Sequence, residues 1–179
     1  QFLDIYHHLT TPLKILFAGE FNAGKSSIIN ALIGKDTLPV GPTPQTAHPS
    51  VIEYSRSSRL TVHTDAGEEQ FELKKIDHLS EIDNEIRYLE IGVNSPLFQQ
   101  IRLVDTPGFN AAEESEFDIP KLLERSDLII WVFDATQTLS QTEISRLEEI
   151  VDADRRLLLL INKIDRLSSI QQLDELFDY

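Results

Sequence analysis

The stretch that decides the fold is Gly19-Glu20-Phe21-Asn22-Ala23-Gly24-Lys25-Ser26, which matches the phosphate-loop pattern of two glycines, a lysine and a serine. The apolar run Leu13 to Ala18 comes directly before it, and a helical stretch continues from Lys25 to Ile33. A tight turn that caps a helix would explain the glycines, but it would not explain a lysine beside a serine. The sequence therefore predicts a strand, a loop and a helix that together bind phosphate.

Each residue type in this loop has a chemical reason to be there. The glycines let backbone amides surround a phosphate at a helix amino terminus. The Lys25 ammonium group can reach the β- and γ-phosphate oxygens, and the Ser26 hydroxyl can ligate Mg²⁺. We expect the nucleotide to be held by residues from the whole loop, namely Gly19, Asn22, Ala23, Gly24, Lys25, Ser26 and Ser27.

A second motif, Asp105-Thr106-Pro107-Gly108, follows the apolar run Ile101 to Val104. An aspartate in this place can hold a water molecule bound to Mg²⁺. The Gly108 amide can meet the γ-phosphate and lose that contact when the phosphate leaves. The same four residues also make a good turn, which is the alternative explanation.

A third motif, Asn162-Lys163-Ile164-Asp165, follows the buried run Arg155 to Ile161. The Asp165 carboxylate can accept hydrogen bonds from the ring N–H and the exocyclic amine of guanine, whereas adenine presents the wrong pattern. We expect Asn162 to tie this loop to the phosphate loop and the Lys163 stem to pack on the base. A solvated loop is the alternative for the tetrapeptide alone, but the three motifs in this order predict a guanine-nucleotide site.

Short apolar runs alternate with helical stretches along the chain, which predicts an α/β fold with a mostly parallel sheet flanked by helices. We expect a proline-rich loop over 34–49 and a hairpin turn at Asp65-Ala66-Gly67. Further strands are expected at Val51–Tyr54, Leu60–Thr64, Gln70–Leu73, Tyr88–Val93 and Leu128–Phe133, and further helices at Ile76–Ile86, Ile119–Arg125 and Thr142–Val151.

Composition narrows the class of protein. The chain has 179 residues, no cysteine and a net charge of −14, and residues 1–50 are neutral in sum. A surface with this much negative charge repels the phosphates of nucleic acids. We therefore expect no direct contact with DNA or RNA. The absence of cysteine favours a cytoplasmic setting, and the five histidines are too scattered to suggest a metal site.

The three motifs resemble the GTPase superfamily, and further residues are similar to the dynamin branch of it. Thr46 and Asp105 are 59 positions apart, which leaves room for an extra hairpin and helix between the two switch regions of a P-loop GTPase fold. Two further stretches carry the likeness to bacterial dynamin-like proteins and mitofusins, namely 38–47 (LPVGPTPQTA) and 127–135 (DLIIWVFDA).

The resemblance assigns roles within the site. It implies that Thr46 closes over Mg²⁺ and helps to place the attacking water, with Thr43 as the rival residue. It names Lys25, Ser26, Thr46, Asp105 and Gly108 as the catalytic set, with Mg²⁺ bound by Ser26 and Thr46 and, through water, by Asp105. Phe109 stands where Ras-like proteins place a water-orienting glutamine, so we expect slow turnover without self-association.

Two residues of the phosphate loop carry open questions. Phe21 replaces the polar residue that dynamins have in this place, which leaves the water-positioning group unidentified. Asn22 resembles the asparagine of potassium-activated GTPases, where its oxygen helps to hold K⁺ near the phosphates. The alternative for Asn22 is that asparagine tolerates a left-handed backbone.

The resemblance also sets expectations about the whole protein. We expect residues 1–12 to form a leading helical segment, with Phe2, Leu3, Ile5 and Leu9 on one face, and 13–179 to form a GTPase domain. Only 14 residues follow Asp165, and the first residue is Gln1, so we expect a longer protein whose GTPase domain continues beyond 179. The remaining chain would touch a membrane and make the protein peripheral there, and homodimers or higher assemblies would form across the nucleotide face.

The function that the resemblance implies is that of a mechano-chemical GTPase of the dynamin class that remodels membranes. Two alternatives stay open at this point. One is a potassium-dependent GTPase associated with ribosomes or RNA, which the asparagine in the phosphate loop favours and the long insertion disfavours. The other is a scaffold that holds GTP without hydrolysing it.

Overall fold

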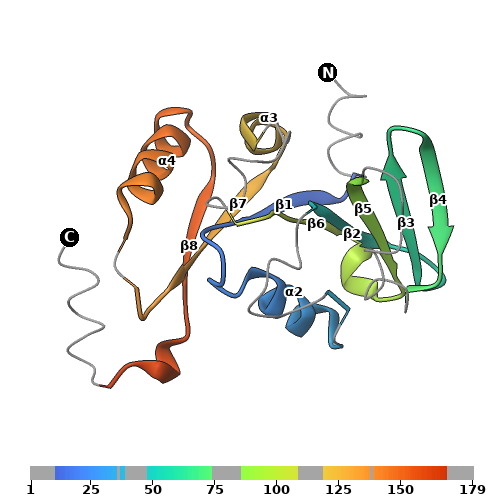
Figure 1. Cartoon of the computed structure of the whole chain (residues 1–179), viewed down its shortest axis with the longest axis horizontal. Helices are drawn as coiled ribbons and strands as arrows, with labels where there is room; N and C mark the ends of the chain where they lie inside the picture. The colour runs from blue at the N-terminus through green and yellow to red at the C-terminus, as the bar shows by residue number, and fades with distance from the viewer. Residues whose placement is uncertain are drawn as a thin grey trace.

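In the computed structural model, eight strands form one sheet within the described residues, which are 11–35, 37–38, 48–73, 86–108, 119–137 and 139–168 (Figure 1). The strands are β1 (Leu13–Ala18), β2 (Ser50–Tyr54), β3 (Arg59–Thr64), β4 (Gly67–Phe71), β5 (Ile86–Val93), β6 (Ile101–Asp105), β7 (Leu128–Asp134) and β8 (Leu157–Asn162). The helices are α2 (Lys25–Ile33), α3 (Ile119–Glu124) and α4 (Gln141–Asp152), with 3₁₀ turns η2 (Pro96–Gln99) and η4 (Ile164–Arg166).

The sheet combines a parallel half with an inserted antiparallel part, in the order β4-β3-β5-β2-β6-β1-β7-β8. β1 pairs in parallel with β6 and β7, and β7 pairs in parallel with β8. β2 also pairs in parallel with β5, whereas β3 is antiparallel to β4 and β5, and β2 is antiparallel to β6. The α/β fold with a mostly parallel sheet is therefore confirmed, and the inserted hairpin is β3-β4.

The parallel half brings the three motifs to one edge of the sheet. β1, β6 and β8 run in the same direction and end at Ala18, Asp105 and Asn162, so the loops after them open at the same edge. Ligands of open α/β sheets bind outside the carboxyl ends of such strands. The topology thus collects motifs that lie far apart in the sequence.

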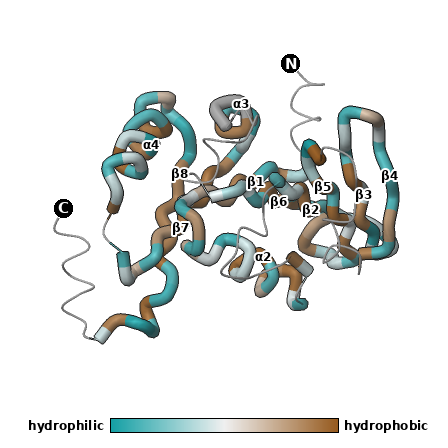
Figure 2. The backbone as a smooth tube through the Cα atoms, viewed as in Figure 1, coloured by the Kyte–Doolittle hydropathy of each residue, from teal (hydrophilic) through white to brown (hydrophobic). Residues whose placement is uncertain are grey.

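The two faces of the sheet carry separate apolar clusters, because successive side chains of a strand point to opposite faces. Phe17 of β1 packs with Ile29 of α2 on one face. Leu16 and Ala18 pack on the other face with Trp131 and with α3 and α4. Figure 1 shows α2 on one side of the sheet and α3 and α4 on the other, and Figure 2 shows apolar residues concentrated along the central strands. Each fully buried large side chain contributes about 1.5–3 kcal/mol.

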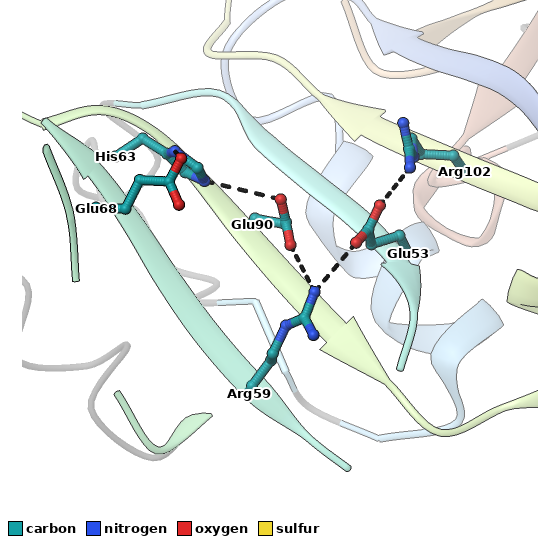
Figure 3. A network of polar contacts seen from close by, with 6 residues as sticks. All are labelled: Glu53, Arg59, His63, Glu68, Glu90 and Arg102. Carbon is teal, nitrogen blue, oxygen red and sulfur yellow. Dashed lines mark hydrogen bonds and ion pairs between the residues drawn. The ribbon is translucent and has the colours of Figure 1, made fainter. Parts of the chain in front are cut away.

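A polar network crosses the inserted half of the sheet, on the face opposite α2 (Figure 3). Arg59 Nη2 lies 2.8 Å from Glu90 Oε1 and 3.3 Å from Glu53 Oε1, and Arg102 Nη2 lies 2.5 Å from Glu53 Oε2. The His63 ring stacks on Tyr88 at 4.0 Å between centroids. The network links five strands through the residues Glu53, Arg59, His63, Glu68, Glu90 and Arg102. It therefore favours the register that places the inserted strands beside the parallel half.

Several expected elements differ from the structure at their ends. β4 begins at Gly67 and not at Gln70. The turn contains only Asp65 and Ala66, because Gly67 already pairs with Thr64 of β3. Ile86 is not the end of a helix but the first residue of β5, where it also pairs with Thr64. The rest of the helix expected up to Ile86 lies outside the described residues, as do residues 1–10 and most of the proline-rich loop. Among the helices of the described part, none has the length and apolar character that crossing a bilayer requires.

Candidate nucleotide-binding site

The phosphate loop follows β1 in a conformation that requires glycine at two positions. Gly19 has a φ of 136°, and a Cβ there would lie 2.3 Å from the Val132 carbonyl oxygen of β7. Gly24 has a φ of 98°, and a Cβ there would lie 2.2 Å from Asn162 Nδ2. Side chains at these positions would separate the loop from β7 and from the third motif. The predicted order of strand, loop and helix is confirmed, and α2 ends against Gly34, as expected.

Asn22 adopts the left-handed conformation with a φ of 63°. One of the two explanations for this asparagine, tolerance of a left-handed backbone, therefore agrees with the structure. The role in holding a monovalent cation stays a prediction.

Lys25 lies at the centre of the loop and is buried. Its Nζ donates hydrogen bonds to the carbonyl oxygens of Gly19 and Glu20, both at 2.9 Å. Burial lowers the pKa of Lys25, and the negative charges of Asp105, Glu143 and Glu20 oppose this shift. A cation held in the concave side of a loop of amides is suited to bind phosphate oxygens.

Ser26 and Asp105 meet although they are 79 positions apart. Ser26 Oγ donates to Asp105 Oδ2 at 2.7 Å, and Asp105 is almost completely buried. The other carboxylate oxygen, Oδ1, is buried without a hydrogen-bond partner among the described residues. Such an unpaired oxygen is costly unless something donates to it. Oxygen ligands of this kind suit Mg²⁺, and the free Oδ1 suits a water molecule bound to Mg²⁺, so the pair fits the predicted metal site.

The second motif is held against the phosphate loop. Thr106 Oγ1 donates to the Phe17 carbonyl oxygen of β1 at 2.9 Å, a contact that the sequence analysis did not assign. Gly108 approaches Phe21 so closely that a Cβ would lie 2.5 Å from both the Phe21 nitrogen and its Cα. Gly108 therefore lies beside the phosphate loop, where the sequence placed the sensor of the γ-phosphate.

The third motif contacts the same loop from β8. Asn162 Nδ2 donates to the Ala23 carbonyl oxygen at 2.9 Å, which confirms the expected tie between the two loops. Lys163 has a φ of 60°, and its Nζ donates to the Asn22 carbonyl oxygen at 2.5 Å and to Asp134 Oδ2 at 2.6 Å. Asp165 is exposed in η4, which follows Asn162 and Lys163.

Asp134 is a residue of the site that sequence reasoning missed. It ends β7, and it accepts hydrogen bonds from Lys163 Nζ and from the Thr136 backbone nitrogen and hydroxyl. Burial acts to raise the pKa of Asp134, but the hydrogen bonds from Lys163 and Thr136 outweigh it and hold that pKa below its usual range. A carboxylate at the carboxyl end of a parallel strand was the only signal that could have identified it.

Some predicted site residues cannot be placed. Thr46, its rival Thr43 and Phe109 lie outside the described residues, so their roles stay predictions. The structure does bring together Gly19, Asn22, Ala23, Gly24, Lys25, Ser26, Asp105, Gly108, Asn162 and Lys163. Ser27 follows in the first turn of α2.

A pH dependence of stability follows from the buried Asp105. Burial raises the pKa of this carboxyl from 3.8 to about 6, against the opposing effects of Lys25 and Ser26. Because the folded protein then binds a proton more tightly than the unfolded chain does, Asp105 stabilises the fold below pH 4 and loses this effect as the pH rises through 6. In Asp105→Asn, the free energy of unfolding relative to wild type should therefore rise by about 2 kcal/mol between pH 4.5 and 7.5.

Urea unfolding of both proteins at the two pH values, without nucleotide or Mg²⁺, measures this difference. The comparison with wild type removes the contributions of all other acidic groups. A difference between the two proteins that is the same at both pH values would contradict the assigned environment of Asp105.

Comparisons with known proteins show which family and fold this chain is similar to. Residues 15–165 match the family model described as the Dynamin family. Dynamin-like protein 2 of Campylobacter jejuni is 29% identical over 98% of the chain, which spans only 30% of that protein. A chain in a solved structure of an oligomerised bacterial dynamin pair superposes with a TM-score of 0.72, at 26% identity, over 96% of this chain and 29% of that chain. The Era protein of Aquifex aeolicus, at 22% identity and a TM-score of 0.52 over 92% of this chain and 45% of that one, shares the fold.

Proposed function

This chain belongs to the dynamin family, and from this premise we propose that it binds a guanine nucleotide with Mg²⁺ and hydrolyses GTP to GDP and phosphate. The observation that carries the proposal is the meeting of three motifs at one edge of the sheet, with Ser26 bonded to Asp105 and Asn162 bonded to Ala23. A chance turn or solvated loop would not produce these contacts across 79 and 139 positions.

The phosphate loop would bind the triphosphate through the backbone amides of 19–27. Lys25 would exchange its two carbonyl partners for β- and γ-phosphate oxygens, which carry a full negative charge and bind an ammonium group more strongly. Ser26 and, through water, Asp105 would hold Mg²⁺, and Thr46 would close over it. The metal, when bound, neutralises charge that develops on the transferred phosphoryl group. The Gly108 amide would contact the γ-phosphate.

The third motif would select the base. Asp165 would accept two hydrogen bonds from the guanine edge, and its exposed position leaves it open to a ligand. The Lys163 ammonium group donates to both the Asn22 carbonyl and Asp134, and its stem would pack on the base. Asn162 would keep the base-reading loop at a constant distance from the phosphates.

At the level of the whole protein, we propose a mechano-chemical GTPase that forms homodimers through its nucleotide face and turns over slowly without them. Residues 1–12 would be a leading helical segment, and 13–179 would belong to the GTPase domain. Support comes from the oligomerised bacterial dynamin pair, which is described as providing a mechanism for the long-range sensing and tethering of membranes. By analogy this protein would be cytoplasmic and peripheral at a membrane that it remodels, and the acidic surface argues against direct nucleic-acid contact.

Phosphate release from the full-length protein tests this function. With Mg²⁺, we expect release from GTP and none from ATP, and a faster rate with liposomes that promote self-association. Rates in potassium, sodium and caesium chloride test Asn22, since a cation held near the phosphates should make potassium the fastest. Equal rates in all three salts would remove the cation role, and tight GTP binding without phosphate release would favour the non-hydrolysing scaffold.

A further inference from the structure

The amino terminus of α4 contacts the phosphate loop through one serine. Ser140 forms a capping box with Glu143: Glu143 N donates to Ser140 Oγ at 3.1 Å, and Ser140 N donates to Glu143 Oε2 at 3.2 Å. The Ser140 hydroxyl donates its own proton to Glu20 Oε1 at 2.6 Å. Ser140 and Glu20 are 120 positions apart, so only the fold brings them together.

The capping box is anchored in the core, which makes Ser140 a fixed point. Glu143 is buried, and its Oε1 also accepts from Trp131 Nε1 of β7 at 3.4 Å. Trp131 is itself fully buried in the cluster under α3 and α4. A group bonded to the buried Glu143, which is itself bonded to a buried strand, moves little.

Glu20 lies between this fixed point and the proposed phosphate site. Its carbonyl oxygen accepts from Lys25 Nζ at 2.9 Å, and its neighbour Phe21 is in close contact with Gly108. The side chain and the carbonyl of Glu20 belong to one residue, so fixing the carboxylate limits the rotation of the peptide that faces Lys25. A loop held in its binding conformation loses less entropy when a ligand binds.

Helix capping alone does not account for this arrangement. An N-cap serine needs only to accept a hydrogen bond from the helix, and Ser140 does so from Glu143. The direction of its hydroxyl proton toward a carboxylate of the phosphate loop is an additional contact, and a charged acceptor makes it one of the stronger kinds of hydrogen bond.

We propose that Ser140 is a positioning residue for nucleotide binding, which holds the Glu20 side chain and thereby the phosphate loop around Lys25. This inference rests on the proposed function, because it concerns the same nucleotide site. It assigns to the start of α4 a role in the affinity for nucleotide that goes beyond the stability of the helix.

Ser140→Asp separates the two roles of the serine. Aspartate is as good an N-cap as serine, so α4 keeps its start. A carboxylate cannot donate to Glu20, and it repels the Glu20 carboxylate at hydrogen-bond distance. In the full-length protein, the affinity for fluorescent GDP should fall about tenfold or more, because the binding conformation of the loop is less populated. The unfolding temperature without nucleotide should stay close to that of wild type.

Two further variants make the result specific. In the double variant Ser140→Asp with Glu20→Gln, the amide at position 20 can donate to the new carboxylate, so most of the lost affinity should return. Thr142→Asp places the same charge on an exposed position of the first turn of α4 and should leave the affinity unchanged. Glu20→Ala removes the contact without altering α4 and should weaken binding in the same direction as Ser140→Asp.

Unchanged affinity in Ser140→Asp, or no recovery in the double variant, would overturn the inference. If Ser140→Asp strongly lowers the unfolding temperature, its affinity no longer isolates the contact, and Glu20→Ala is the test. Wild-type affinity of Glu20→Ala for GDP would then overturn the inference. Failure of the proposed function looks different, since wild-type protein would then bind no guanine nucleotide at all.

Discussion

Lys25→Ala is expected to weaken GTP binding by about 10²- to 10³-fold, the largest loss from any single substitution in this site. Truncating one partner of a buried, hydrogen-bonded charge pair costs about 2–5 kcal/mol. Lys25 is buried and directed into the loop by two carbonyl oxygens, so no other side chain of the loop can replace its charge. Titration of the full-length protein with fluorescent GTP in excess Mg²⁺ measures the loss.

Lys14→Ala is the matched control for this prediction. Lys14 lies near the exposed amino-terminal end of β1, the strand that leads into the phosphate loop. Its backbone nitrogen donates to Asp127 Oδ2, and its carbonyl oxygen accepts from the Asp127 backbone nitrogen, so the bonds to Asp127 do not involve its side chain. Removing the Lys14 side chain should leave the affinity for GTP within about twofold of wild type, because salt screens a surface charge at the end of β1 that lies away from the phosphate loop. Equal affinities of Lys25→Ala and wild type for GTP would mean that the loop does not bind the phosphates.

Asp165→Asn is expected to reverse the preference of the site from guanine to xanthine. Asparagine offers one acceptor and one donor where aspartate offers two acceptors. Its amide nitrogen would face the exocyclic amine of guanine, which leaves two donors opposed, whereas xanthine carries a carbonyl oxygen at that place. We expect GDP affinity to fall about 10- to 100-fold and XDP affinity to rise by a similar factor.

Competition of GDP and XDP against a fluorescent nucleotide measures both changes in one experiment. Because Asp165 is exposed, the substitution should leave the unfolding temperature unchanged. Asp152→Asn, an exposed aspartate at the end of α4, is the control and should not alter base preference. Loss of GDP binding without any gain for XDP would assign Asp165 a role in folding and not in base recognition.

Much of this fold could be predicted because local and tertiary preferences agree in the central strands. Leu13–Ala18 and Lys25–Ile33 form the strand and helix at the expected residues. The apolar run sets the strand, and the phosphate loop and Gly34 set the two ends of the helix. The contact of Asn162 with the phosphate loop could also be predicted, because the loops after parallel strands of one sheet open at the same edge.

The parts that escaped prediction depend on pairings between distant residues. Ile86 fits a helical period, but its pairing with Thr64 across the inserted sheet decides its strand conformation. No motif assigns a role to Asp134 or Ser140, and Glu20 stands at a variable position of the phosphate-loop pattern. The contact of Asp134 with Lys163 and that of Ser140 with Glu20 exist only in the folded chain. The polar network of the inserted strands likewise depends on the sheet order and on no local pattern.

Calorimetric titration of the full-length wild-type protein with GDP and with ADP, in Mg²⁺, tests the central claim most directly. Because Asn162 ties the base-reading loop to the phosphate loop and Asp165 would read the base, we expect GDP to bind at least about 100-fold more tightly than ADP. Equal affinity for the two nucleotides, or no binding of either one, would contradict it.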